Sequence, residues 1–290
     1  MENTPVNLSI ILPAKNEATG LGTLLPRIRQ QLPDAELILV DDGSTDATAQ
    51  IARDQGARVI SHPYSLGNGA AVKAGARVAT GDVLVFMDAD GQHDPADIPR
   101  LLAKLDEGYD MAVGARVKGS QASVGRSFAN AMYNHFASLM TGHQILDLTS
   151  GFRAVRARQF RRFLYLLPNG FSYPTTVTMA FFRTGYPVSY VPIQAARRVG
   201  QPSHIRPVRD GIRFLLIIFK VATLYSPLKL FFPVSLLFFL AGAVHYLNTF
   251  LTMNRFTNMS ALLFTAAVIV LMMGLVSEQV TATSYREADG

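Results

Sequence analysis

The chain has 290 residues and a formal net charge of +6, from 27 lysines and arginines against 21 aspartates and glutamates. This length suits one sizeable domain with an additional segment, and the basic balance favours nucleic acid, anionic lipid or a phosphorylated ligand as a partner. The absence of cysteine excludes disulfides and cysteine–metal sites.

The first residues do not resemble a secretory signal peptide. Residues 1–7 carry no basic side chain, and the apolar run 8–12 is too short for the hydrophobic region of a signal. We therefore expect the N-terminal part of the chain to stay in the cytoplasm.

Strands and helices are expected to alternate over the first 115 residues. A buried strand at 8–12 precedes a polar turn, in which Asn16 is the expected N-cap of a helix at 18–32. Further strands are expected at 36–40, 57–61, 82–87 and 110–115. Further helices are expected at 46–55, from the loop at 67–69 to residue 78, and at 96–107. This alternation predicts a mainly parallel sheet with helices on both faces, which is the α/β class.

The most informative element is the apolar run 83–87, which leads directly into Asp88-Ala89-Asp90. Side chains alternate along a strand, so the two carboxylates point to one face. They repel each other unless a cation lies between them, and Mg2+ commonly joins one or two carboxylates to substrate phosphates. The pattern suggests a metal–diphosphate site. The alternative is a polar strand end that runs into a turn.

Polar clusters follow two earlier strands as well, at residues 13–17 and 41–44. Ligands of parallel sheets bind outside the carboxyl ends of the strands. We therefore expect these clusters and residues 88–92 to converge on one site.

Two long apolar segments lie near the C-terminus, at residues 230–247 and 259–277, and neither contains Asp, Glu, Lys or Arg. As helices they span roughly 27–28 Å, close to the ~30 Å hydrocarbon core of a bilayer. We predict a transmembrane hairpin. Two buried helices of a soluble core are the alternative, but such helices usually show a polar face.

Basic residues concentrate before the first apolar segment. Residues 195–229 contain seven lysines and arginines and one acidic residue, whereas the loop 248–258 contains only Arg255. The positive-inside rule places the N-terminal domain and the C-terminus in the cytoplasm. The expected organisation is a domain at 1–205, a juxtamembrane interfacial segment at 206–228, two transmembrane helices within 229–280, and a tail at 281–290.

Four motifs occur in the order and spacing of family 2 glycosyltransferases with the GT-A fold. They are Pro13-Ala14-Lys15-Asn16-Glu17, Asp41-Asp42-Gly43-Ser44, Gly67-Asn68-Gly69 followed by Gly75, and Asp88-Ala89-Asp90-Gly91-Gln92. The segment 147–153 and the hairpin resemble one branch, the polyprenyl-phosphate glycosyltransferases, which include the dolichol-phosphate mannose synthases. The resemblance covers about residues 6–205 and implies a Rossmann-like GT-A domain followed by the hairpin.

The resemblance also implies roles for individual residues. The implied nucleotide-binding residues are Pro13, Asn16, Glu17, Asp42, Gly67 and Asp88. The implied metal ligands are Asp88, Asp90 and Gln92, for Mg2+ or Mn2+. The implied catalytic residues are Asp90, Arg116, Arg126 and Arg198, with Arg197 as the alternative to Arg198. Arginine suits the last three because its guanidinium binds phosphate oxygens in pairs.

Other interpretations of these residues remain open. Turn formation and helix capping are the alternative for the polar residues at 13–17 and at Asp42. Gly75 is more typical of helix packing, and Lys73 suits either a phosphate contact or a solvated helix charge. Arg153 begins a run of five arginines with no acidic residue, some of which we expect to be solvated or near lipid headgroups.

The implied function is inverting, metal-dependent transfer of a sugar from a nucleotide diphosphate sugar to a polyprenyl phosphate of the dolichyl or undecaprenyl type. A phosphate monoester is largely dianionic at pH 7 and hardly needs a general base. The alternatives are transfer to a hydroxyl of a glycan or lipid, which needs a base, and a membrane-anchored protein that binds nucleotide sugar without turnover.

The expected partners are the nucleotide sugar, the lipid phosphate and the membrane, and a homo-oligomer is left open. Nucleic acid is not expected, because the basic residues concentrate beside the membrane segments.

Overall fold

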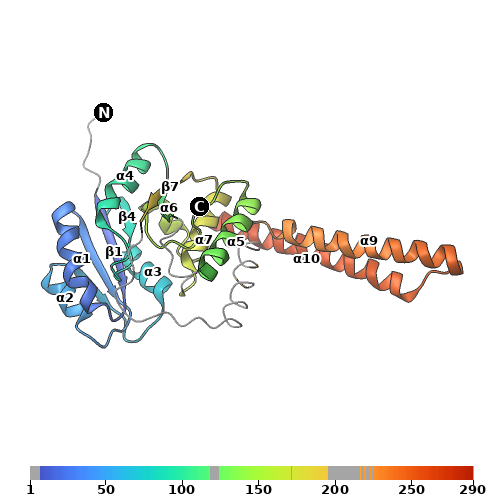
Figure 1. Cartoon of the computed structure of the whole chain (residues 1–290), viewed down its shortest axis with the longest axis horizontal. Helices are drawn as coiled ribbons and strands as arrows, with labels where there is room; N and C mark the ends of the chain where they lie inside the picture. The colour runs from blue at the N-terminus through green and yellow to red at the C-terminus, as the bar shows by residue number, and fades with distance from the viewer. Residues whose placement is uncertain are drawn as a thin grey trace.

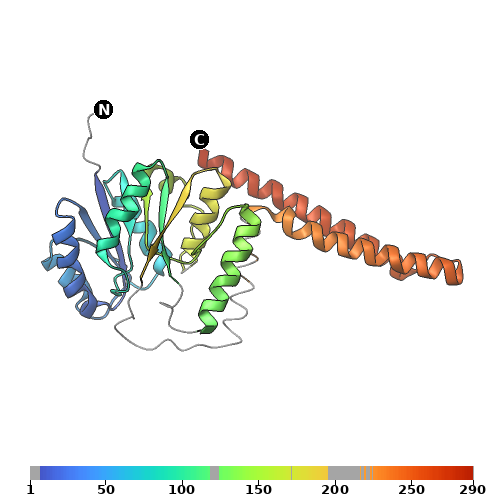
Figure 2. The ribbon, with the colours of Figure 1, turned by 45° about the horizontal axis from the view of Figure 1, so that its top comes forward.

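The computed structural model describes residues 7–117, 124–170, 172–194 and 225–289, together with positions 216, 219 and 223. For residues 124–130 and 284–289 it describes the backbone alone. An N-terminal α/β domain leads into a long helical hairpin, which leaves the domain as a rod (Figures 1 and 2).

A seven-stranded sheet in the order β3-β2-β1-β4-β6-β5-β7 forms the centre of the domain. The strands are β1 (Leu8–Ala14), β2 (Glu36–Asp41), β3 (Arg58–Ser61), β4 (Val83–Phe86), β5 (Met111–Arg116), β6 (Arg153–Arg156) and β7 (Val188–Ile193). Adjacent strands are parallel except at β6, which pairs antiparallel with both β4 and β5. The α/β class with a mainly parallel sheet is confirmed.

The helices of the domain cover both faces of the sheet. They are α1 (Ala18–Gln31), α2 (Thr48–Asp54), α3 (Asn68–Val78), the 3-10 turn η1 (Pro95–Asp97), α4 (Ile98–Asp106), α5 (Val124–Thr141), α6 (Ala157–Arg162) and α7 (Tyr173–Arg183). The expected helices and strands up to residue 116 are confirmed to within two residues at most ends. Residues 118–123 and 195–215, which include Arg198, lie outside the described residues.

Alternating side chains of β1 build two separate cores. Ile10 and Leu12 belong to a buried cluster with Leu21 and Leu25 of α1, whereas Ile11 belongs to a cluster with residues of α3, α6 and α7. Successive strand residues point to opposite faces, so this sheet is buried on both sides. Buried faces on both sides hold the carboxyl ends of the strands in fixed positions.

Helix α3 packs unusually close to the sheet at Gly75. A Cβ atom there would lie 2.4 Å from Ile11 Cγ2 and 3.2 Å from Val40 Cγ2. The helix-packing interpretation of Gly75 is therefore confirmed, and a larger residue would push α3 away from β1.

The C-terminal hairpin consists of α9 (Pro227–Met253) and α10 (Asn258–Asp289). Both helices are long and apolar enough to cross a membrane, and only 11% and 17% of their most apolar windows are buried. Small residues line their mutual contact: a Cβ on Gly274 would lie 2.7 Å from Phe231 Cβ, and Ser235 Oγ donates to Ala267 O at 2.8 Å. Close backbone approach at small residues is typical of packing between membrane helices.

We expect Gly75→Ala to destabilise the domain by about 1–3 kcal/mol, since the added methyl overpacks the contact between α3 and β1. Gly22→Ala is the matched control, because a Cβ at Gly22 of α1 meets nothing within 4 Å. Alanine should instead stabilise that helix by roughly 0.5–1 kcal/mol. Unfolding in detergent micelles, followed by circular dichroism, measures both. Equal midpoints for the two variants would contradict the packing argument.

Candidate active site

A cleft of about 450 Å³ opens at the carboxyl edge of the sheet. It lies between the ends of β1, β2 and β4, the start of α3, and the loop and helix that follow residue 148. Its lining residues are Pro13, Ala14, Lys15, Glu17, Asp42, Ser65, Gly67, Asn68, Ala71, Asp88, Ala89, Asp90, Thr149, Gly151, Tyr173 and Pro174. The three polar clusters expected to converge do meet here.

Asn16 joins the loop after β1 to the loop after β2 at the rim of this cleft. Its N–H donates to Ser44 Oγ at 2.9 Å, and its Oδ1 accepts from the Thr45 N–H at 2.8 Å. The expectation that Asn16 caps α1 is wrong: the cap position is Glu17, whose own N–H donates to Thr48 Oγ1. Asn16 has a φ of 55°, which asparagine tolerates better than most residues. Its side chain is not part of the cleft lining.

Asp42 organises the loop that follows β3. Its carboxylate accepts hydrogen bonds from His62 Nδ1, Ser65 Oγ and the N–H groups of Leu66 and Gly67, all at 2.7–2.9 Å. Burial raises the pKa of the Asp42 carboxyl, but these four bonds outweigh it and lower the pKa to about 2. A carboxylate offers about four acceptor sites, and these four bonds use them. Asp42 therefore shapes the cleft by holding this loop.

The glycines of the third motif allow contact between two chain segments. Gly67 has a φ of 103°, and a Cβ there would lie 2.5 Å from Asn169 O. At Gly69 the corresponding distance to Pro168 O is 2.0 Å. Lys73 belongs to the same contact, because its Nζ donates to Leu167 O and Asn169 Oδ1. Lys73 thus ties α3 to residues 167–169, a role that the sequence did not indicate.

Asp88 and Asp90 both line the cleft directly after β4. Asp90 Oδ1 accepts the N–H of Gln92 at 3.1 Å, which folds the turn back on the carboxylate. The Asp88 carboxylate lies against Gly151, where an added Cβ would be 3.1 Å from Asp88 Oδ2. Glycine at 151 therefore allows the loop to approach the carboxylate closely.

These two carboxylates fit a divalent ion that receives its other ligands from substrate and water. Among the described residues, no group of three or more His, Cys, Asp or Glu is placed to hold a metal on its own. Mg2+ is usually bound through one or two carboxylates together with substrate phosphates and water, and a pair at the wall of a cleft meets that requirement.

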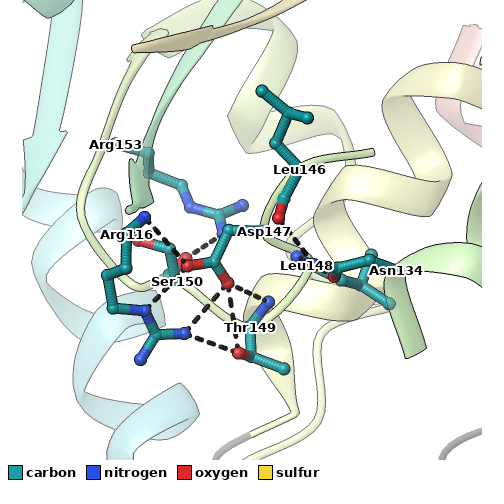
Figure 3. A network of polar contacts seen from close by, with 8 residues as sticks. All are labelled: Arg116, Asn134, Leu146, Asp147, Leu148, Thr149, Ser150 and Arg153. Atoms are coloured by element: carbon teal, nitrogen blue, oxygen red, sulfur yellow. Dashed lines mark hydrogen bonds and ion pairs between the residues drawn. The ribbon is translucent and has the colours of Figure 1, made fainter. Parts of the chain in front are cut away.

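Arg116 is held by Asp147, a residue to which the sequence motifs assigned no role. Arg116 Nε and Nη2 donate to the two Asp147 carboxylate oxygens at 2.7 and 2.9 Å, and Nη2 also donates to Thr149 Oγ1 at 2.7 Å (Figure 3). Burial raises the pKa of the Asp147 carboxyl, but Arg116 outweighs this and lowers it. The guanidinium is thus directed at loop 147–149, next to the cleft.

Asn134 of α5 holds the same loop from the other side. Its Nδ2 donates to Leu146 O at 2.6 Å, and its Oδ1 accepts from the Leu148 N–H at 2.9 Å (Figure 3). Together with Arg116 these bonds fix the backbone that carries Thr149 and Gly151 into the cleft wall.

Arg153 is not among the solvated arginines of its run. Its side chain is fully buried in β6, where Nη1 donates to Thr178 Oγ1 and Pro174 O, and Nη2 donates to Ser150 O. Burial lowers its pKa, and Asp88 is among the charges that act against this. Arg153 therefore supplies positive charge behind the cleft wall.

His93 is a further buried group at this site. It stacks on Phe152 with ring centroids 4.9 Å apart, and burial lowers its pKa to about 4, so the ring is neutral at pH 7. It packs under the turn that carries Asp90.

The structure thus brings together most of the site residues expected from the sequence. Pro13, Glu17, Asp42, Gly67, Asp88 and Asp90 line the cleft, whereas Asn16, Gln92 and Arg116 lie beside it. The Arg126 side chain and the whole of Arg197 and Arg198 lie outside the described residues. Asp147, Asn134 and Arg153 were missed, because each acts through a partner distant in sequence.

Two family models match this chain. The model described as Glycosyl transferase family 2 matches residues 9–164, and the model described as GtrB C-terminal hairpin matches residues 226–283. The first spans β1 to α6 and the second spans α9 and most of α10.

Several similar proteins are named for undecaprenyl phosphate. The undecaprenyl-phosphate 4-deoxy-4-formamido-L-arabinose transferase of Pseudomonas fluorescens is 34% identical over 189 residues, covering 58% of this chain and 55% of that protein. Glycosyltransferase AglJ of Haloferax volcanii is 28% identical, covering 79% of this chain and 76% of that one. This chain spans about half the length of the arabinose transferases that it matches.

Solved structures share the fold of the α/β domain. Glucosyl-3-phosphoglycerate synthase of Mycobacterium tuberculosis, crystallised with Mn2+, uridine-diphosphate-glucose and phosphoglyceric acid, aligns with a TM-score of 0.60 at 23% identity, covering 75% of this chain and 79% of that one. Mannosyl-3-phosphoglycerate synthase of Rubrobacter xylanophilus aligns with a TM-score of 0.60 at 20% identity, covering 75% and 72%. At these identities the likeness establishes the GT-A fold alone.

We expect Asp42→Asn to remove about 2 kcal/mol of stability at pH 7, since the charged carboxylate is what the four donors stabilise. Folding lowers this pKa, so the contribution is present above pH ~4 and is lost as the pH falls toward 2. Denaturant unfolding in detergent between pH 2 and pH 7 measures it. Asp106→Asn, at an exposed position of α4, is the control. If D42N were as stable and as acid-sensitive as the unmodified chain, the assignment would fail.

Proposed function

We propose that this chain, which belongs to Glycosyl transferase family 2, transfers a sugar from a nucleotide diphosphate sugar to a polyprenyl phosphate at a membrane surface. The observation that carries the proposal is the pair of carboxylates, Asp88 and Asp90, in the wall of a cleft at the carboxyl edge of the sheet. An apolar hairpin fixed to the same domain favours a lipid acceptor.

Asp88 and Asp90 are the proposed ligands of Mg2+ or Mn2+, with the Gln92 side chain as a third candidate. Such an ion, when bound, neutralises charge that develops on the leaving diphosphate. A neighbouring fold crystallised with Mn2+ and a uridine diphosphate sugar supports this assignment. Gly151 contributes by keeping the wall close to Asp88.

The nucleoside is proposed to lie toward β1 and β2. Pro13 and Glu17 line that end of the cleft and would contact base and ribose directly. Asp42 and Asn16 would act through the loops that they hold, since their oxygen atoms already accept hydrogen bonds within the protein. Gly67 would act in the same way, since its N–H donates to Asp42 Oδ2 and its carbonyl oxygen accepts from the Ala71 N–H.

The acceptor phosphate oxygen is proposed to attack the anomeric carbon from the face opposite the diphosphate. A new bond forms between carbon and the acceptor oxygen, the bond to the diphosphate oxygen breaks, and the nucleoside diphosphate leaves with the electron pair, so the configuration inverts. The acceptor is largely dianionic at pH 7, so no protein base is required. Arg126 and Arg198 are the proposed contacts to the two anions.

Arg116 is proposed to supply positive charge near Asp88 and to hold the cleft wall in position. Its guanidinium binds Asp147 and Thr149, and its positive field reaches Asp88. It thereby holds the cleft wall and counters the negative charge that gathers there when two phosphate-bearing substrates bind.

The domain at 1–205 is proposed to face the cytoplasm, followed by the juxtamembrane segment 206–228 and by two membrane-crossing helices. The concentration of basic residues before α9 supports this topology through the positive-inside rule. Similar proteins named for undecaprenyl phosphate support the lipid acceptor.

Replacing Asp90 tests the proposed metal site. We expect Asp90→Asn to lower the rate of sugar transfer to polyprenyl phosphate by on the order of 10²–10³, because a charge that acts on the leaving group is lost. The assay measures radiolabelled sugar extracted into organic solvent, from a screen of nucleotide sugars. Asp82→Asn, at an exposed position at the opposite end of β4, is the matched control and should keep its rate. A near-normal rate for D90N would refute the metal site.

A comparison of two acceptors tests the proposed chemistry. In vesicles that contain either a polyprenyl phosphate or the corresponding polyprenol, we expect labelled product only from the phosphate, since the alcohol needs a base to become a nucleophile. Product from the polyprenol, with a rate that follows a titrating carboxylate, would favour a hydroxyl acceptor instead.

A further inference from the structure

Glu278 is the only formally charged residue between positions 258 and 283 of an otherwise apolar helix. Charged residues are rare in membrane-spanning helices, where they usually face the protein interior and pair with another group. Glu278 follows this pattern: its side chain is 25% exposed and is bonded to α7 and α9. An ionisable residue in such a helix that points into the protein and has a partner marks a functional position.

The Glu278 carboxylate joins three helices. Its Oε1 accepts from Arg183 Nη2, at the end of α7, at 3.2 Å. Its Oε2 accepts from Ser226 Oγ and from the Leu228 N–H, both at 3.2 Å, at the start of α9. Carboxylates are favoured at helix N-termini, where backbone N–H groups lack partners inside the helix. One side chain of α10 therefore caps α9 and binds the α/β domain.

A second set of contacts fixes the same end of the hairpin to α5. Lys229 Nζ donates to Met140 O at 2.9 Å, and the Tyr225 hydroxyl donates to Thr141 O at 3.2 Å. Both carbonyls lie in the last turn of α5, where cations and donors are favoured. Tyr225 and Leu230 also pack against the buried cluster of α5, loop 145–148 and α7. Figures 1 and 2 show the hairpin leaving the domain beside these helices.

The contacts of Glu278 and those of Tyr225 and Lys229 attach the hairpin to the domain at two places. Two attachments restrain rotation of the hairpin relative to the domain, whereas a single one would act as a hinge. The lipid-anchored phosphate has a fixed depth in the bilayer, so the orientation of the hairpin sets the position of the cleft relative to the acceptor. Displacement of reacting groups by about 1 Å can cost two orders of magnitude in rate.

We infer that Glu278 is a positioning residue: through Arg183 and the start of α9 it fixes the domain at the height where a membrane-embedded acceptor phosphate meets the cleft. This inference rests on the proposed function. It involves no contact between Glu278 and either substrate, so its effect depends on where the acceptor is held.

The test compares Glu278→Gln with the unmodified chain on two acceptors. One is a long polyprenyl phosphate in phosphatidylcholine vesicles, and the other is a short, water-soluble isoprenoid phosphate. We expect kcat/KM to fall by about 10-fold or more for the vesicle acceptor and to stay within about twofold for the soluble one, because only the first is held at a fixed depth. The KM for the nucleotide sugar should not change.

Glu107→Gln is the matched control, because it removes an exposed ion pair with Lys104 on α4. It should leave both rates unchanged. Equal losses of E278Q on both acceptors would assign Glu278 a purely structural role and overturn the inference, as would the absence of any loss with vesicles.

A second measurement separates this inference from the proposed function. The chain has no cysteine, so spin labels at Asp106→Cys and Leu240→Cys report one distance between the domain and the hairpin. E278Q should broaden that distance distribution in vesicles, and an unchanged distribution would overturn the inference. If the unmodified chain transfers sugar to neither acceptor, the proposed function fails. The distance measurement still tests whether Glu278 fixes the hairpin to the domain.

Discussion

Electrostatic repulsion between two carboxylates at one strand end is the constraint around which the cleft is arranged. Asp88 and Asp90 follow the same strand into the cleft wall, and like charges brought close together favour a cation between them. The protein places its own positive charges behind the wall: Arg116 is paired with Asp147, and Arg153 is buried in β6. The side of the carboxylates that faces the cleft is left to a proposed divalent ion and the diphosphate that it would bind.

A second constraint comes from the membrane. An acceptor confined to a bilayer surface meets an enzyme only if the catalytic cleft lies at the right depth and orientation. The base of the hairpin is held by polar bonds at three helix ends, those of α5, α7 and α9. At α9 and α5 these bonds satisfy backbone groups that a helix end leaves unpaired, and at α7 an ion pair between Arg183 and Glu278 joins the hairpin to the domain.

Local patterns were sufficient for the elements that depend on local sequence. Apolar periodicity predicted β1 to β5, α1 to α4 and the hairpin, and the rule for carboxyl ends brought residues 13–17, 41–44 and 88–90 together. The antiparallel insertion of β6 between β4 and β5 could not be predicted, because its pairing is nonlocal. The burial of Arg153 depends on the same pairing, so its place in a basic run did not reveal it. The four donors to Asp42 and the Arg116–Asp147 pair likewise come from distant segments.

Anomalous diffraction from crystals grown with Mn2+ and a nucleoside diphosphate would show whether Asp88 and Asp90 bind a metal ion. We expect a manganese peak between the carboxylates of Asp88 and Asp90, with diphosphate oxygens among its ligands. A bound nucleotide with manganese elsewhere, and with both carboxylates turned away from the cleft, would contradict this expectation.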